Sequence, residues 1–173
     1  MKKTVVPALI LAVICLVVVS LLVLTNEITR DRIAAAEAAA REKAIRSVLV
    51  GAEVAPEEIS EGVYAGHKAD GTFIGYAFLT SAKGYGGEVS TVVGISADGK
   101  ILGISVTAPD ETPGLGANVA KDAFTSQFVN KDKDSFVADF EAVTSATYSS
   151  EAVKAGIADA FAAFEKIQKG EEN

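Results

Sequence analysis

The longest apolar run of the chain lies close to its start. Residues 5–24 read VVPALILAVICLVVVSLLVL and contain no charged side chain. A helix of this length rises about 30 Å, which is the thickness of the hydrocarbon layer of a bilayer. Lys2 and Lys3 precede the run, so the positive-inside rule favours a cytoplasmic N-terminus and a domain on the other side of the membrane. The pattern predicts a membrane anchor over residues 1–25.

A cleaved signal peptide is the alternative interpretation of this run. The run is longer than the apolar region of a usual signal peptide, and no small-residue cleavage site follows it directly. The Ala-rich stretch over residues 34–40 offers a later place for cleavage. We expect the run to be kept as an anchor, with cleavage as the other outcome.

A second helical pattern follows over residues 26–50 and predicts a helical stalk. It is rich in Ala, Glu and Arg, which favour helices, and it pairs Glu37 with Arg41 and Glu42 with Arg46 at i,i+4 spacing. Its apolar face is supplied by Ile28, Ile33, Ile45, Val48 and Leu49. Such a stalk can pack on its own domain or on a neighbouring membrane protein.

Beyond the stalk, the pattern changes to short segments rich in Val, Ile, Thr and aromatic residues. Residues 63–65 and 72–79 lie on either side of an Asp-Gly pair, which predicts a β-hairpin. Residues 88–96 and 101–108 flank a second Gly-containing turn and predict another hairpin. A tight turn reverses the direction of the chain, so the two strands of each predicted hairpin run antiparallel.

The remaining segments complete an α+β domain that we predict over residues 51–173. Pro56 and the two Glu after it predict a loop. Apolar residues at helical spacing predict a helix over 117–130, and a shorter apolar pattern predicts a last strand over 136–143. A long apolar stripe predicts a closing helix over 149–169. A domain of this size can bury its own core.

Composition excludes several classes of protein. The chain has 173 residues with 16 Lys and Arg against 23 Asp and Glu, a net charge of −7. Nucleic-acid binding through bulk positive charge is therefore excluded. A single Cys and a single His exclude a disulfide framework and a zinc or iron–sulfur site built from this chain's own Cys and His. We predict no metal site.

Two glycine-containing loops and one hydroxyl-rich cluster are the candidates for chemistry. The loops read KGYGG at 83–87 and ETPGLG at 111–116, and the cluster reads VTSATYSS at 143–150. Glycine allows the backbone to approach a flat ligand closely, but it also simply forms turns. Neither loop is a Walker A or GxGxxG sequence, so neither of those nucleotide sites is indicated.

The hydroxyl-rich cluster lies where the last predicted helix begins. The first N–H groups of a helix are unpaired and carry partial positive charge, so a phosphate is stabilised there. The alternative is that Ser149 or Ser150 only caps the helix. His67 is the single His and lies in a predicted strand or hairpin edge beside Lys68, so a Ser/His/Asp arrangement is not indicated and we predict no catalytic residue.

Taken together, the anchor, the stalk, the two loops and the cluster resemble the G subunit of the Rnf electron-transport complex and the related C subunit of sodium-pumping NADH:quinone oxidoreductase. That family attaches FMN through a phosphoester to a Thr in a pattern like D-x-x-[ST]-G-A-T. The corresponding stretch here is EAVTSAT at 141–147, so the resemblance implies covalent FMN on Thr147. Glu141 stands where the pattern usually has Asp, and Ser145 where it usually has Gly, which restricts the φ angle of the turn.

The resemblance also implies the other residues of an FMN site. A separate flavin transferase would use FAD and a divalent metal to place FMN on Thr147 and release AMP. Thr144, Ser145 and Ala146 would flank the phosphate. The flavin ring would be met by residues of the two loops, namely Tyr85, Gly86, Glu111, Thr112, Pro113, Gly114, Leu115 and Gly116.

By the same resemblance, the chain is a membrane-anchored flavoprotein subunit that relays electrons on the extracytoplasmic side of the cell membrane. The family couples electron transfer between ferredoxin and NAD to Na⁺ or H⁺ movement. This subunit would be an electron carrier rather than a complete enzyme, with other Rnf membrane subunits as partners. Three alternatives stay open: a role in the quinone-linked sodium pump, a stand-alone extracytoplasmic flavin carrier, and a non-redox membrane-anchored binding or assembly module without flavin.

Overall fold

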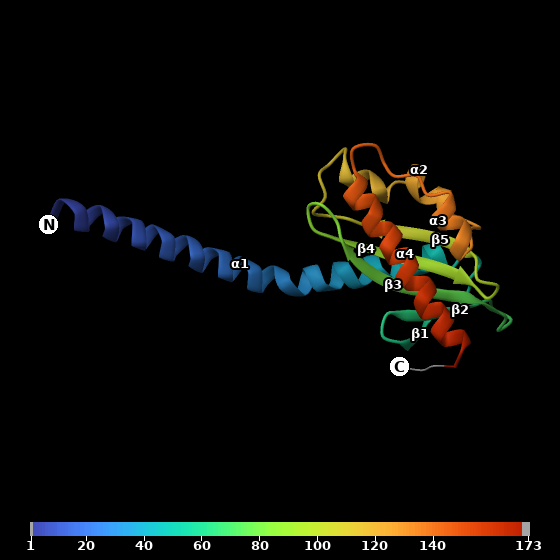
Figure 1. Ribbon diagram of the computed structural model, residues 1–173. Coiled ribbons are helices and arrows are strands. Elements are labelled where there is room, and N and C mark those ends of the chain that lie inside the picture. Colours follow the sequence, from blue (N-terminus) through green and yellow to red (C-terminus); the bar gives the residue numbers. More distant parts are fainter. Residues whose placement is uncertain (1, 171–173) are drawn as a thin grey trace. The chain divides into compact units, whose positions relative to one another are not determined.

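The computed structural model describes the backbone of residues 2–170 and the side chains of residues 6–170 (Figure 1). The chain divides into two compact units, Met1–Arg41 and Glu42–Asn173. Helix α1 runs over Lys2–Val48 and contains the predicted anchor. By length and composition, it is apolar enough to cross a membrane, as the sequence predicts. Its large apolar side chains between residues 6 and 24 are exposed, which suits contact with lipid.

The second unit is built on one five-stranded antiparallel sheet with strand order β1-β2-β3-β4-β5. The strands are β1 (Glu57–Ser60), β2 (Val63–His67), β3 (Phe73–Lys83), β4 (Glu88–Ser96) and β5 (Ile101–Thr107). Strands β2 and β3 pair as one hairpin, and β4 and β5 pair as the second. Both predicted hairpins are confirmed, because a local turn brings each pair of β-rich segments together.

Strand β1 corrects the prediction of a loop after Pro56. Its four residues read EEIS and all are exposed, so the segment has no alternation of apolar and polar positions. Pairing with β2 makes it a strand, with Glu58 opposite Tyr64. A short edge strand with acidic side chains also discourages pairing with another molecule.

Helix α4 (Thr147–Gln168) confirms the predicted closing helix. It crosses one face of the sheet in Figure 1 and packs on β3 and β4. The core on this face joins the two elements through Phe78, Val93, Val153, Ile157 and Phe161. The helix begins two residues before the predicted start. Ser149 and Ser150 therefore lie inside its first turn, and Ala146 is the N-cap instead.

The last turns of α1 cover the other face of the sheet. Ile45, Val48 and Leu49 are buried and pack on Ala77 and Val92. Ala77 precedes Phe78, and Val92 precedes Val93, and both of these following residues belong to the core beneath α4. Because side chains alternate between faces along a strand, Ala77 and Val92 point to the opposite face. The apolar face of the predicted stalk is therefore real at its C-terminal end, whereas its earlier isoleucines, Ile28 and Ile33, are exposed.

The connection from β5 to α4 is made of short helices. They are η1 (Gly116–Ala120), α2 (Asp122–Thr125), η2 (Ser126–Phe128) and α3 (Lys133–Ala138). The single helix predicted over 117–130 is wrong in detail, because the backbone is extended at Lys121 and again at Val129. The apolar residues it was based on, such as Phe124 and Phe128, are nevertheless buried.

The strand predicted over 136–143 is wrong. Residues 133–138 form helix α3, which starts at a capping box. The Asp132 side chain accepts a hydrogen bond from Ser135 N, and the Ser135 hydroxyl receives the Asp132 N–H in return. This local pairing fixes a helix start that the apolar spacing of Phe136, Val137 and Phe140 did not reveal.

Candidate functional site

The two glycine-containing loops and the start of α4 meet around one hollow of about 390 Å³. A volume in this range suits a small-molecule or cofactor site. The hollow is lined by Tyr85, Glu111, Thr112, Leu115, Gly116, Ser145, Ala146, Thr147, Tyr148 and Ser149. Three segments that are far apart in the sequence are thus brought together. Four other residues implied by the resemblance are not among the lining residues: Gly86, Pro113, Gly114 and Thr144.

The first loop is glycine-rich because it lies directly against residues 110 and 111. A Cβ atom on Gly86 would stand 2.1 Å from the Asp110 carbonyl oxygen, and one on Gly87 would stand 2.6 Å from the Asp110 Cβ atom. Neither distance is possible for a real side chain. These two glycines therefore permit close packing of one loop on the other, which places Tyr85 at the hollow.

The second loop contains a tight turn over Thr112–Leu115. The Leu115 N–H donates to the Thr112 carbonyl at 3.1 Å, Pro113 follows the first turn residue, and Gly114 has a φ of 79°. Pro followed by a residue of positive φ is the pattern of a type II turn. Asn118 fixes the turn from the following helix, with its Nδ2 atom 2.8 Å from the Gly114 carbonyl. Pro113 and Gly114 thus shape the loop while its flanking residues line the hollow.

Glu111 is the most buried carboxylate of this region, with 3% of its surface exposed. Its Oε1 atom accepts hydrogen bonds from Tyr85 N at 2.7 Å and Gly86 N at 3.1 Å. Its Oε2 atom accepts from the Ser149 hydroxyl at 2.8 Å. Burying a carboxylate is costly unless it is hydrogen-bonded, and here both oxygens are satisfied.

A tight turn over residues 143–146 leads into α4. The Ala146 N–H donates to the Val143 carbonyl at 3.0 Å, and Ser145 at the third position has a φ of 66°. This position of a type II turn favours Gly. Ser150 holds the turn from inside the helix, since its hydroxyl receives the Val143 N–H at 3.0 Å and donates to the Ala146 carbonyl at 2.9 Å.

The first turn of α4 offers donors to an anion. Its N-cap, Ala146, makes no side-chain capping bond, so the helix start keeps N–H groups free for a ligand. The 22-residue helix adds the positive end of its dipole. Thr147 is exposed at this point and lines the hollow. A phosphate group fits this donor set.

Large apolar side chains surround the mouth of the hollow without being covered. Tyr85 is 75% exposed, Tyr148 is 73% exposed and Leu115 is 46% exposed. The rings of the two tyrosines have centroids 6.3 Å apart and are tilted by 42°. Exposed apolar groups that gather at a hollow mark a binding site, and aromatic faces suit a flat ring system. The donor set and this rim together fit FMN.

Tyr148 and Ser149 line the hollow but were not among the residues implied for the FMN site, although both lie in the hydroxyl-rich cluster. Tyr148 directly follows the implied attachment residue, so its position was a usable signal. Ser149 was considered only as a helix cap. Its bond to Glu111 joins residues 38 positions apart, and no local pattern predicts such a contact.

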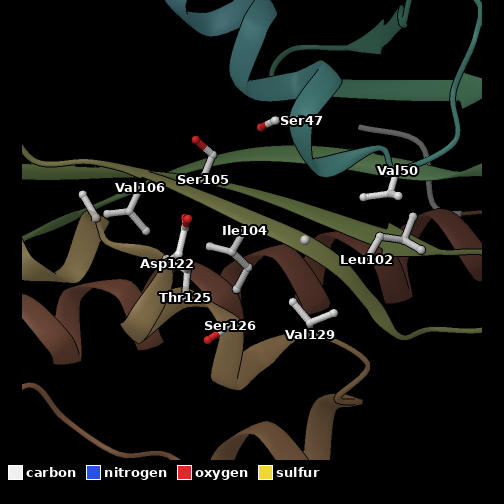
Figure 2. Close-up of a pocket in the computed structure, with 12 residues that line it drawn as sticks. Ser47, Val50, Leu102, Ile104, Ser105, Val106, Asp122, Thr125, Ser126 and Val129 are labelled. Carbon is white, nitrogen blue, oxygen red and sulfur yellow. The ribbon is translucent and has the colours of Figure 1, made fainter.

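A second hollow of about 390 Å³ lies beside strand β5 (Figure 2). Residues 102–106 of β5 form one side, and α2, η2 and the end of α1 supply the others. Figure 2 shows the Ile104 side chain on the same side of β5 as Asp122 and Thr125, whereas the Ser105 side chain points to the other side, toward Ser47. None of the residues implied by the resemblance lines this hollow. The first hollow therefore carries the functional argument.

Two family models match parts of the chain. Residues 84–162 match the family described as the FMN-binding domain, and residues 1–48 match the RnfG N-terminal region. The first match spans every residue implied for the FMN site. The chain is similar to the G subunits of Rnf complexes.

Two Rnf-type relatives show the extent of the likeness. The G subunit of the proton-translocating ferredoxin:NAD(+) oxidoreductase complex of Clostridium ljungdahlii is 38% identical over 105 residues, covering 56% of each chain. The G subunit of the Na(+)-translocating ferredoxin:NAD(+) oxidoreductase complex of Acetobacterium woodii is 37% identical over 126 residues, covering 66% of this chain and 59% of that protein. The matches thus span little more than half the length of these relatives. Together with the match to the FMN-binding domain family and the apolar helix, they indicate a membrane-anchored FMN-binding protein.

Two solved structures share part of the fold of this chain. The C subunit of Na(+)-translocating NADH-quinone reductase from Parabacteroides distasonis has a TM-score of 0.51 at 20% identity, covering 60% of each chain. The NqrC protein of Shewanella oneidensis has a TM-score of 0.50 at 21% identity, covering 57% of this chain and 54% of that one. At these identities the likeness concerns the fold alone, and it confirms the predicted α+β class.

Proposed function

We propose that this chain is a membrane-anchored flavoprotein subunit of an Rnf-type ion-translocating ferredoxin:NAD oxidoreductase complex. It relays electrons through FMN attached by a phosphoester to Thr147. Residues 1–25 anchor it, residues 26–50 form a helical stalk whose last turns pack on the sheet, and residues 51–173 carry the flavin outside the cytoplasm. The observation that carries the proposal is the meeting of both glycine-containing loops with Thr147 at one hollow.

Attachment uses the exposed hydroxyl of Thr147. A flavin transferase would join the Thr147 Oγ atom to the FMN phosphorus of FAD. The pyrophosphate bond breaks, AMP leaves, and the hydroxyl proton passes to solvent or to a base of the transferase. The product phosphate carries negative charge next to the first turn of α4, where unpaired N–H groups and the helix dipole stabilise it.

The rest of the hollow orients the flavin. Tyr85, Leu115 and Tyr148 offer apolar and aromatic surface at the mouth. When bound, FMN supplies one- and two-electron transfer, and the protein supplies position and electrostatics. Because the link is at the phosphate, it leaves the ring free. A covalent tether keeps the local flavin concentration high outside the cytoplasm, where a dissociated flavin would be lost.

Covalent flavin fluorescence tests the attachment. The chain is expressed in a host with an active flavin transferase, membranes are solubilised in denaturant, and the gel is read for flavin fluorescence. We expect a fluorescent band for the wild type and none for Thr147→Ala. Thr107→Ala is the matched control, because Thr107 is an exposed threonine of β5 outside the hollow, and its band should stay.

The same preparation tests the role in a complex. Native purification through a C-terminal tag should bring down integral-membrane partner subunits together with the fluorescent band. A fluorescent chain that purifies alone would favour the stand-alone carrier. A wild-type chain without fluorescence, in a host that loads another substrate of the transferase, would favour the module without flavin.

A further inference from the structure

We infer that Glu111 is a positioning residue that holds the two sides of the hollow at a fixed separation, and that it acts through its neighbours rather than by touching FMN. The inference rests on the proposed function. Its starting point is that the Glu111 carboxylate is 3% exposed and uses both oxygens in hydrogen bonds within the protein.

The three bonds of Glu111 connect three separate segments. Oε1 receives the backbone N–H groups of Tyr85 and Gly86 in the first loop. Oε2 receives the hydroxyl of Ser149 in the first turn of α4. Glu111 itself begins the second loop. The carboxylate is thus the common point of the three segments that form the hollow.

Glycines close around this carboxylate. A Cβ atom on Gly84 would lie 2.2 Å from Oε1, and one on Gly116 would lie 2.1 Å from Oε2. Any larger residue at either position would displace the carboxylate. The absence of a side chain at Gly84 and Gly116 therefore leaves room for the Glu111 carboxylate and its hydrogen bonds.

The bonds fix the residues that face the ligand. Glu111 holds the backbone of Tyr85 on one side and Ser149 on the other, and Ser149 follows Tyr148 and lies two residues after Thr147. The Tyr85–Tyr148 pair at the mouth therefore has its spacing set through Glu111. Loosening either bond should change the surroundings of the flavin ring before it unfolds the domain.

The test compares variants of the full-length chain carrying covalent FMN. Ser149→Ala removes only the bond to α4. Glu111→Leu removes all three bonds, while Glu111→Gln keeps a similar shape and the means to bond both sides. The readouts are the fluorescence yield and visible circular dichroism of the flavin in the folded protein, together with the melting temperature. Ser96→Ala is the matched control, because Ser96 is a buried serine at the far end of β4 that bonds Lys100.

We expect Ser149→Ala to raise the flavin fluorescence yield and weaken its circular dichroism, with Glu111→Gln close to the wild type. Ser96→Ala should lower the melting temperature without changing the flavin signals. In the apo protein, amide hydrogen exchange at Tyr85 and Gly86 should accelerate in Glu111→Leu and stay slow in Glu111→Gln. If Glu111→Leu fails to fold, the flavin signals of Ser149→Ala still test the positioning role of Glu111.

Wild-type flavin signals in a folded, loaded Ser149→Ala variant would overturn the inference and leave Glu111 a purely structural residue. Equal changes in Glu111→Gln and Glu111→Leu would also overturn it, since Gln can keep the bonds. The wild-type sample separates these outcomes from failure of the proposed function. A wild type without covalent FMN would reject the attachment, whereas hydrogen exchange would still report on the bonds of Glu111.

Discussion

Ser145 shows how one residue bears on the whole site. It has a φ of 66° in the turn just before Thr147, at the position where the related pattern usually has Gly. For a residue with a Cβ atom, this left-handed conformation costs about 1–2 kcal/mol. Two serines in the first turn of α4 hold this region together. The Ser150 hydroxyl accepts a hydrogen bond from Val143 N in the turn, and the Ser149 hydroxyl donates to Glu111. The turn is thus held in place despite its strain.

Ser145→Gly should stabilise the domain. Glycine removes the strain but has more freedom in the unfolded chain, so we expect a net gain of about 0.5–1 kcal/mol in the free energy of unfolding. Denaturant unfolding of residues 42–173, or of the whole chain in detergent, measures it. Ser145→Ala is the control, and it should bring no gain. A loss of stability in Ser145→Gly would show that the serine side chain contributes more than its backbone costs.

At the scale of elements, the sheet is covered on both faces, and one cover is the end of α1. Gly94 of β4 lies so close to this helix that a Cβ atom would stand 2.3 Å from the Val48 carbonyl oxygen. Backbone cannot move aside as a side chain can. The residues of α1 from Glu42 onward therefore belong to the folded unit rather than to a free stalk.

Gly94→Ala should therefore destabilise the second unit by about 1–3 kcal/mol or more, because it overpacks a site with no room. Gly66→Ala is the matched control. The three atoms nearest to its Cβ atom would all belong to the Leu49 side chain rather than to backbone, the closest at 2.9 Å, so the loss should be smaller. Thermal unfolding compares the two. Equal losses would contradict close packing of the helix end on β4.

The capping residue of helix α3, Asp132, should make the stability of the domain depend on pH. Hydrogen bonds from Ser135 hold the pKa of Asp132 below its ordinary value. A carboxyl whose folded pKa is lowered stabilises the folded state above its ordinary pKa of 3.8 and loses that contribution as the pH falls through the folded value. Asp132→Asn keeps a capping side chain but cannot titrate. Its stability should fall less between about pH 5 and pH 2 than that of the wild type. Urea unfolding at a series of pH values measures this. An equal loss of unfolding free energy at low pH in the wild type and in Asp132→Asn would contradict this role of Asp132.

The elements that the sequence predicted correctly are those decided locally. The Asp-Gly turn fixes the β2–β3 hairpin, and the long apolar stripe fixes α4. Strand β1 needs its partner β2 to exist, so its exposed EEIS sequence gave no sign. Helix α3 depends on the Asp132–Ser135 capping box, which outweighed the strand-like spacing around Phe136.

The site was predictable in its motifs but not in its connections. The two loops and Thr147 were identified from short sequence patterns, and they meet at one hollow. Their mutual support depends on contacts between distant positions, above all Glu111 with Tyr85 and Ser149. Such contacts arise when α4 packs on the sheet, and short patterns within the sequence do not reveal which distant residues then meet.

At the scale of the whole molecule, an extracytoplasmic electron relay requires the flavin domain to lie outside the cytoplasm. Lys2 and Lys3 precede the apolar run and favour a cytoplasmic N-terminus, although Arg30 and Arg32 follow it. A C-terminal alkaline phosphatase fusion should be active in a bacterial host, and a C-terminal green fluorescent protein fusion should be dark. The opposite pair of results would place the domain in the cytoplasm and remove the case for an extracytoplasmic electron relay.

The most direct test of the central claim is peptide mass spectrometry of the wild-type chain from a host with an active flavin transferase. Fragment ions should place the added mass, FMN less one water, on Thr147. An unmodified peptide over residues 141–154, in cells where another transferase substrate is flavinylated, would contradict covalent attachment. FMN on a different residue would contradict the assignment of Thr147.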